Sequence, residues 1–256
     1  MADPDLHALA PEVTAWPGNA DVDWDSFDSE AYFEHNYGHL RREDAEIIRI
    51  VADHFAKYGP QRWRANAIDV GSGTNLYPAL TMLPFAGQVT LYERAFTNCT
   101  WLTGQLVEPA DSWHQFWQSI SDGRSEYLQV AEPWELLHSR AEVVRGNVLA
   151  LRPGQYDMGT MFFVAESITT RVDEFRRATR HFVGSLTSKA PFAAAFMRDS
   201  SGYIVAGKSF PACSITEKHV ERCLAPLAYI EDIQVVDSSD LREGYCGMIV
   251  ATGRRR

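Results

Sequence analysis

The most constraining feature of this chain is an apolar strand that runs directly into a glycine-containing turn. Residues 67–75 read AIDVGSGTN and lead into a helical pattern. Glycine at positions 71 and 73 permits a sharp backbone bend and lets a ligand approach closely, and N–H groups at the start of the following helix favour polar or anionic ligand groups. Turns of this kind are typical of sites that bind a nucleotide-like cofactor.

Short apolar runs alternate with amphipathic stretches along the rest of the chain. This alternation is the sequence form of a mostly parallel sheet covered by helices on both faces, so the predicted fold class is α/β. We expect seven strands, at 66–70, 88–93, 142–148, 156–164, 190–197, 228–236 and 245–252. We expect helices at 43–58, 75–83, 96–107, 171–186 and 215–225.

Two of these helices have start signals. Ser214 with Glu217, and Thr170 with Asp173, have the spacing of a capping box. The stretch 109–139 is longer than a compact α/β unit needs between a helix and a strand, and we interpret it as an inserted helical pair.

The turn also favours one class of cofactor. The dinucleotide pattern Gly-x-Gly-x-x-Gly would require glycine at position 76, where Leu76 stands, and this counts against NAD and FAD. The next strand ends in Glu93, twenty residues after Gly73. A carboxylate at this place can accept hydrogen bonds from both ribose hydroxyl groups of a cofactor. The alternatives are that the turn is only structural and that Glu93 is a solvated strand end.

Composition limits the partners. The formal charge of −10, a pI near 5.3 and the lack of a Lys/Arg stripe disfavour nucleic acid as a partner. We expect no membrane insertion and no export, because the chain begins without a signal-peptide pattern and has no stretch of about 18 uncharged apolar residues. Its cysteines form no CxxC pair, which fits a reducing cytoplasm.

Metal and covalent catalysis are not indicated. His35 and His39 would share one face of a helix, but no Asp, Glu or Cys completes a ligand set at a suitable spacing. No Gly-x-Ser-x-Gly motif is present, and no cysteine stands in a motif that marks a nucleophile.

Three separated segments resemble one family, the nicotinamide, phenylethanolamine, indolethylamine and thioether methyltransferases. Residues 27–37 (FDSEAYFEHNY) are similar to the family's N-terminal lid, residues 69–77 to its cofactor turn, and residues 200–203 with Phe210 to the loop after its fifth strand. The resemblance runs from about Trp24 to the C-terminus. It implies a Rossmann-like class I methyltransferase fold, with a leader and helical lid over 1–65 and a domain that binds S-adenosylmethionine over 66–256.

The resemblance also implies roles for individual residues. Tyr32 and Tyr37 would close over the methionine end of the cofactor, although both could instead simply pack the lid onto the core. Asn147 stands where the family commonly has aspartate beside the adenine; its side-chain oxygen can still accept from the adenine amino group, but it brings no charge. The other implied cofactor contacts are Gly71, Ser72, Gly73, Thr74, Tyr77, Glu93, Asn98 and Val148.

The end of the fifth predicted strand departs from the family pattern. Amine- and pyridine-methylating relatives have a carboxylate there that faces the acceptor, whereas here Phe196 occupies one such place and the nearest acid is Asp199. The acceptor is therefore expected to be less cationic or more aromatic than a simple amine. Our candidates for acceptor positioning or proton removal are Tyr32, Asp199 and Tyr203.

These observations together predict a cytoplasmic enzyme that transfers a methyl group in line from S-adenosylmethionine to a small aromatic, N-heterocyclic, amine or indole-type molecule and releases S-adenosylhomocysteine. A monomer is favoured, and the oligomeric state stays open. Nitrogen, carbon and sulfur all stay open as the methylated atom. Two alternatives also remain: a nicotinamide-dependent oxidoreductase, and an inactive methyltransferase-like subunit that only binds ligand.

Overall fold

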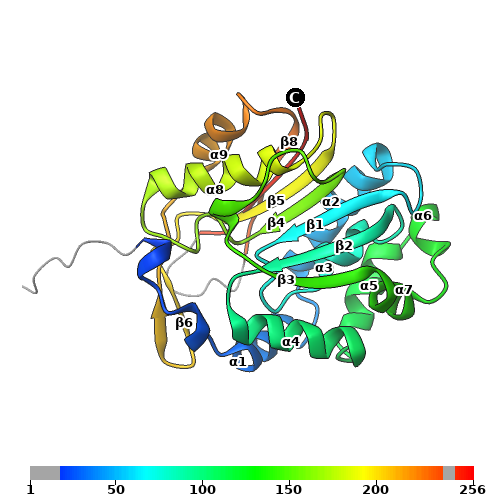
Figure 1. Ribbon diagram of the computed structural model, residues 1–256, viewed down its shortest axis with the longest axis horizontal. Helices are drawn as coiled ribbons and strands as arrows, with labels where there is room; N and C mark the ends of the chain where they lie inside the picture. The colour runs from blue at the N-terminus through cyan, green and yellow to red at the C-terminus, as the bar shows by residue number, and fades with distance from the viewer. Residues whose placement is uncertain (1–17, 239–245) are drawn as a thin grey trace, which may run out of the picture.

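A seven-stranded sheet forms the centre of the computed structural model, which describes residues 18–238 and 246–256 (Figure 1). The strand order is β3-β2-β1-β4-β5-β9-β8. The sheet consists of β1 (Ala65–Val70), β2 (Ala86–Glu93), β3 (Ala141–Arg145), β4 (Met158–Phe162), β5 (Pro191–Met197), β8 (Ala228–Val236) and β9 (Met248–Arg255). A separate hairpin is formed by β6 (Tyr203–Val205) and β7 (Lys208–Phe210).

Helices flank this sheet and cover its carboxyl-terminal edge. The α-helices are α1 (Ser29–Tyr37), α2 (Arg42–Tyr58), α3 (Tyr77–Met82), α4 (Phe96–Val107), α5 (Trp113–Ser121), α6 (Ser125–Leu128), α7 (Pro133–Arg140), α8 (Val172–Ser185) and α9 (Glu217–Leu224). Short 3-10 helices are η1 (Asn19–Asp21), η2 (Trp24–Ser26) and η3 (Val148–Ala150). Within the described residues, no helix is both long and apolar enough to cross a membrane.

Strand pairing confirms the α/β fold class and the mostly parallel sheet. The strands from β3 to β5 pair in parallel, and β9 runs antiparallel to both of its neighbours, β5 and β8. The chain leaves β1 toward β2 on one side and later returns to place β4 on the other. In such sheets, ligands bind in the crevice beyond the carboxyl ends of the strands where the order reverses.

Alternating side chains of the strands build a core on each face of the sheet. On β1, Ala67 belongs to the core formed with α2 and α3, whereas Ile68 belongs to the core formed with α8 and α9. On β5, Ala193 and Phe192 divide in the same way. Because successive side chains enter the core on one face or the other, and both faces are buried, these strands read as near-continuous apolar runs in the sequence.

Two local predictions were wrong. Helix α9 begins with Thr216 as its N-cap in a capping box with His219, two residues later than the Ser214 pattern predicted. Helix α8 has Arg171 as its N-cap without a side-chain cap bond, so the predicted capping box of Thr170 with Asp173 does not form. In both cases a residue one or two positions further along the chain takes the N-cap position.

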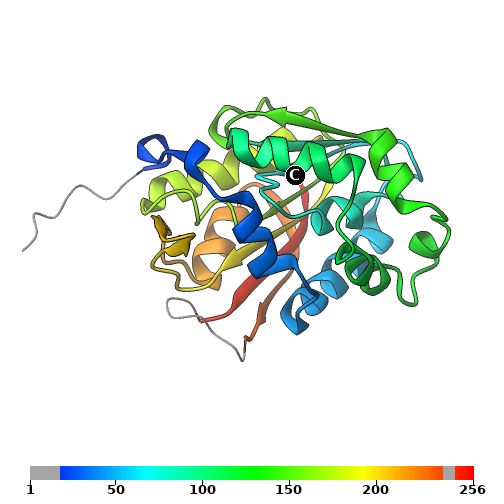
Figure 2. The same cartoon turned by 90° about the horizontal axis from the view of Figure 1, so that it is seen from below.

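Some elements were not predicted from the sequence. The stretch 109–139 holds three helices, α5 to α7, rather than a pair. The β6–β7 hairpin was missed because its strands are only three residues long. Of the leader and lid expected over 1–65, residues 1–17 lie outside the described residues, and the part that follows begins with the 3-10 helix η1. Helix α1 and the hairpin lie at the same end of the sheet, as Figures 1 and 2 show.

Candidate functional site

The turn after β1 is held in a conformation that favours glycine. Gly71 and Gly73 have φ angles of 68° and 56°, in the left-handed region. A Cβ atom on Gly71 would lie 2.5 Å from Cγ2 of Val164, inside the core. On Gly73 it would meet nothing closer than the Gly71 carbonyl oxygen at 3.7 Å. The space beside Gly73 is therefore open, as a close-approaching ligand requires.

A buried carboxyl group supports the base of this turn. Thr160 on β4 donates a hydrogen bond from its Oγ1 to Oδ1 of Asp69 at 2.7 Å. Burial raises the pKa of Asp69 to about 7. Ser72 Oγ donates to the Asp69 carbonyl oxygen at 3.1 Å. Asp69 thus connects the turn to β4 from below, a supporting role that the sequence analysis did not assign.

Glu93, at the end of β2, binds the turn directly. Its Oε2 accepts a hydrogen bond from the Gly73 N–H at 2.9 Å, and its Oε1 accepts from the Ala95 N–H at 2.7 Å and from Asn98 Nδ2 at 3.4 Å. Only 7% of the residue is exposed, and burial raises the pKa of its carboxyl while the backbone N–H groups lower it. The alternative of a solvated strand end is therefore wrong.

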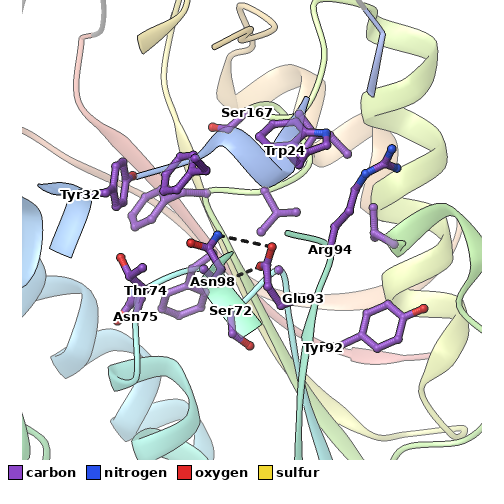
Figure 3. Close-up of a pocket in the computed structure, with 18 of the residues that line it drawn as sticks. Trp24, Tyr32, Ser72, Thr74, Asn75, Tyr92, Glu93, Arg94, Asn98 and Ser167 are labelled. Atoms are coloured by element: carbon purple, nitrogen blue, oxygen red, sulfur yellow. Dashed lines mark hydrogen bonds between the residues drawn. The ribbon is translucent and has the colours of Figure 1, made fainter. Parts of the chain in front are cut away.

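A narrow cavity opens above the turn, and we call it the turn cavity. It has a volume of about 100 Å³. Figure 3 shows the Glu93 side chain among the residues that surround it, with Asn98 beside it and Tyr92 pointing away. The sequence-predicted residues that line the turn cavity are Tyr32, Tyr37, Gly71, Ser72, Gly73, Thr74, Glu93, Asn98, Asn147, Val148 and Tyr203.

Two predicted site residues lie elsewhere. Tyr77 is fully buried in the core, where its ring stacks on Phe116 at 5.6 Å and meets Tyr37 at 6.1 Å, so it lies behind the cavity wall. Asp199 lines neither this cavity nor the one described below, and its Oδ2 lies 3.8 Å from Nε of Arg198. The structure thus brings together most of the predicted set but not these two side chains.

The N-terminal segment contributes wall residues that the sequence analysis missed. Asn19 donates from its backbone N–H to Glu174 Oε2 at 2.8 Å and from its side-chain Nδ2 to Asn147 Oδ1 at 3.2 Å. Trp24 donates from Nε1 to the Asn19 carbonyl oxygen at 3.1 Å. Asn19 and Trp24 both line the turn cavity. No periodicity marks this segment in the sequence, so only its long-range contacts reveal the role.

The side-chain oxygen of Asn147 is already engaged within the protein. It accepts from Asn19 Nδ2 and, as an N-cap, from the Leu149 N–H at 3.0 Å. An amide oxygen has two lone pairs, so these bonds use its capacity, and the amide nitrogen remains as the group that can meet a ligand. The sequence analysis had expected the oxygen to face the adenine.

A second and wider cavity adjoins the first, and we call it the hairpin cavity because the β6–β7 hairpin forms one wall. It has a volume of about 480 Å³, within the roughly 300–1,000 Å³ range of small-molecule sites. Among the described residues, four line both cavities: Tyr32, Phe163, Ser167 and Tyr203. The two spaces are thus separated by shared side chains, chiefly aromatic ones.

Aromatic contacts join the lid to the hairpin. The Tyr32 ring lies 5.1 Å from that of Phe27 and 6.3 Å from that of Tyr203, and Tyr203 stacks on Phe210 at 5.4 Å. The Tyr203 hydroxyl donates to the Ser167 carbonyl oxygen at 3.4 Å. Burial raises the pKa of Tyr203 well above its usual value. This phenol therefore stays protonated at neutral pH and can donate a hydrogen bond rather than remove a proton.

A second buried carboxyl group stands behind the hairpin cavity. Glu166 is fully buried, and its Oε1 accepts from the Met197 N–H at 2.9 Å and from Ser167 Oγ at 3.1 Å. Burial raises its pKa to about 7. Glu166 connects the loop after β4 to the end of β5. The sequence analysis did not select it, because the pairing depends on the adjacency of these two strands.

Comparison with known proteins identifies the fold. No protein-family model matches the chain, and no curated protein matches it in sequence. The N-methyltransferase NodS of Bradyrhizobium japonicum WM9, in complex with S-adenosyl-L-homocysteine, is similar in structure with a TM-score of 0.53 at 11% identity, over 90% of this chain and 93% of that one.

Two further solved structures are similar. The 1,6-didemethyltoxoflavin-N1-methyltransferase of Burkholderia thailandensis, with bound 1,6-didemethyltoxoflavin and S-adenosylhomocysteine, has a TM-score of 0.52 at 16% identity, over 89% of this chain and 84% of that one. The [4+2]-cyclase SpnF has a TM-score of 0.52 at 16% identity, over 82% of this chain and 80% of that one. At these identities the likeness confirms the predicted Rossmann-like fold.

Proposed function

We propose that this protein binds S-adenosylmethionine in the turn cavity and transfers its methyl group to a small molecule held in the hairpin cavity. The observation that carries this proposal is the adjacency of the two cavities: the turn cavity, beside a glycine turn bound by Glu93, shares the lining residues Tyr32, Phe163, Ser167 and Tyr203 with the hairpin cavity. A cofactor and an acceptor could meet there without either having to leave the protein.

Three features of the turn cavity fit this cofactor. A Cβ atom on Gly73 would enter the open space, so glycine leaves room for close approach of a ligand. The Thr74 hydroxyl is buried and has no hydrogen-bond partner among the described residues, although its residue lines the cavity. Glu93 supplies the carboxylate for ribose hydroxyls. The structures of NodS and of the toxoflavin methyltransferase hold S-adenosylhomocysteine, which supports the same choice.

Residue roles follow from this arrangement. We propose that Asn147 donates from its Nδ2 to the adenine and that Val148 packs beside it. The backbone of residues 71–74 would lie along the cofactor, with Tyr37 and Asn98 completing the wall. Tyr77 would act from behind by supporting Tyr37. The resemblance to the nicotinamide and phenylethanolamine methyltransferase family remains part of this proposal.

For methyl transfer, the main task of the protein is to orient the acceptor relative to the methyl group. When bound, the sulfonium group of S-adenosylmethionine supplies an activated methyl group. Tyr32 and Tyr203 would hold the acceptor in line at the junction, and the aromatic lid would exclude water. Orientation can contribute roughly 7–11 kcal/mol to lowering a barrier. Asp199 lies outside both cavities, and we assign it no contact with the acceptor.

The lid is proposed to be the segment from Trp24 to Tyr37. Of the residues before position 65, those of α2 do not fit a moving lid, because Ile47, Val51 and Phe55 are fully buried in the core of the sheet domain. The turn cavity, at about 100 Å³, is smaller than the roughly 300 Å³ lower limit of small-molecule sites. Lid movement would therefore accompany cofactor entry.

The experiment is a screen for methyl transfer. Purified protein is incubated with methyl-labelled S-adenosylmethionine and a panel of small aromatic and heterocyclic acceptors, and mass spectrometry measures S-adenosylhomocysteine and methylated product. We expect acceptor-dependent formation of both in equal amounts. Binding of S-adenosylhomocysteine without turnover of any acceptor would favour an inactive binding subunit or another reaction, such as that of SpnF, whose similar fold carries a cyclase.

A further inference from the structure

We infer that the hairpin cavity selects an uncharged, flat aromatic acceptor with hydrogen-bonding groups and discriminates against ammonium-type amines. This inference rests on the proposed function, since it assigns the acceptor to that cavity. Its basis is the set of side chains that line the cavity. A site for an amine would be expected to contain a carboxylate, and the described lining contains none.

The lining of the hairpin cavity contains no Asp, Glu, Lys or Arg among the described residues. Its ionisable members are Tyr32, Tyr203 and His35. An ammonium group taken out of water without a carboxylate partner carries a large desolvation cost. His35 can only be neutral or positive, so its protonated form would repel a cation further. The lining therefore favours an acceptor without charge.

Two acids, Glu166 and Asp199, are sequence neighbours of lining residues but do not line the cavity themselves. Glu166 stands one residue from Ser167, but its Oε1 is engaged by the Met197 N–H and the Ser167 hydroxyl, and Glu166 is absent from the lining. Asp199 follows β5 and lies beside Arg198, whose Nε is 3.8 Å from its Oδ2. Glu166 Oε2 is buried without a hydrogen-bond partner among the described residues, but neither Glu166 nor Asp199 contributes to the lining of the cavity.

Flat apolar walls indicate the shape of the acceptor. Tyr203 and Phe210 are stacked with an interplanar angle of 23°, and both line the cavity together with Phe163 and Tyr32. Aromatic rings pack on such faces by stacking or by edge contact. A planar ring system in the cavity would lie against these walls with its reacting atom near Tyr32 and Tyr203, the shared border with the turn cavity.

Serine hydroxyl groups supply the polar contacts. Ser200, Ser201 and Ser209 line the cavity, and Ser200 is only 4% exposed. A hydroxyl group both donates and accepts hydrogen bonds, so this set suits a phenol, a carbonyl or a ring nitrogen. Neutral groups of these kinds gain partners here without the need for a counter-charge.

The first test compares matched ligands that share one ring system. Indole is paired with tryptamine, and 2-naphthol with 2-(aminomethyl)naphthalene, and affinity is measured on the full chain with saturating S-adenosylhomocysteine. We expect each neutral member to bind at least tenfold more tightly than its amine. Equal binding, tighter binding of the amines, or no binding of either neutral compound would overturn the inference.

The second test places a charge in the cavity. Ser209→Asp and, independently, Ser201→Asp should shift the ratio of affinities toward the amine by at least tenfold, whereas the uncharged matches Ser209→Asn and Ser201→Asn should not. An unchanged ratio in a folded Asp variant would contradict the assignment of this cavity. Affinity for S-adenosylhomocysteine on the same samples separates the failures: intact binding with amine preference overturns this inference alone, whereas absent binding overturns the proposed function as well.

Discussion

Replacing Gly73 with alanine tests whether the open space beside the turn is the place of a ligand. The new Cβ atom would meet no heavy atom closer than 3.7 Å, so the fold has room for it. The φ angle of 56° is the only local obstacle, and a left-handed conformation costs a residue with a Cβ atom roughly 1–2 kcal/mol. A modest loss of stability is therefore expected.

The effect on ligand binding should be larger than this conformational cost implies. A methyl group placed in a cavity of about 100 Å³ would occupy the surface that a cofactor must contact. We expect the affinity for S-adenosylhomocysteine to fall at least tenfold, which is about 1.4 kcal/mol, in Gly73→Ala. The β-branched Gly73→Val should abolish binding while the protein stays folded.

A matched control separates the strain from the steric block. Gly123 has a φ angle of 69°, and a Cβ atom there would have nothing within 4 Å. Gly123→Ala should therefore lose a similar amount of stability in thermal unfolding and keep full affinity in calorimetric titration. If Gly73→Ala binds S-adenosylhomocysteine as tightly as the wild type does, the turn does not contact the cofactor and the reasoning is refuted.

Three further predictions follow from the buried acids and the lid. Glu93→Ala should weaken S-adenosylhomocysteine binding by about 1.5–3 kcal/mol, the scale of a hydrogen bond to a charged group. It should also lower the stability of the fold, because the Gly73 N–H loses its acceptor. Unchanged affinity in calorimetric titration would contradict the first expectation. Burial raises the pKa of Glu166 from 4.5 to about 7 in the folded state, so the free energy of unfolding should fall as the pH rises through this range. The expected loss is about 3 kcal/mol in total. Glu166→Gln should then show a flatter dependence of Tm on pH between 5 and 8 than the wild type, and an identical dependence would count against a raised pKa. Hydrogen exchange across residues 27–37 should slow markedly with S-adenosylhomocysteine while the strand at 66–70 changes less, and equal exchange with and without ligand would make that segment structural.

The fold could be predicted from the sequence because its elements carry strong local signals. The strand at 66–70 and the helix at 96–107 agree with β1 (Ala65–Val70) and α4 (Phe96–Val107) to within a residue. Both have the hydrophobic pattern of their element and are bounded by residues that end it. Helix starts were less predictable: Thr216 caps α9 in place of Ser214, and the sequence alone does not separate them because Ser and Thr are both favoured at this position.

The candidate site could be predicted where one strand end or turn defines it. Glu93 was recognised because its position after the second strand is fixed by spacing. Asn19 and Glu166 could not be recognised, because each gains its place through contacts with residues distant in sequence, Glu174 and Met197. Asp199 was predicted to be a site residue because it follows β5 closely in sequence. Its backbone has a φ angle of 52°, and its side chain lies beside Arg198 rather than in a cavity.

The central claim is that the turn cavity binds S-adenosylmethionine, and calorimetric titration of the full chain with S-adenosylhomocysteine, alongside NAD, tests it most directly. Leu76 takes the place of the third glycine of the dinucleotide pattern, which disfavours NAD. Glu93, which binds the turn, would accept hydrogen bonds from the ribose hydroxyl groups. We predict saturable binding of S-adenosylhomocysteine at one site per chain and no heat from NAD. No binding of S-adenosylhomocysteine, or tighter binding of NAD, would contradict the claim.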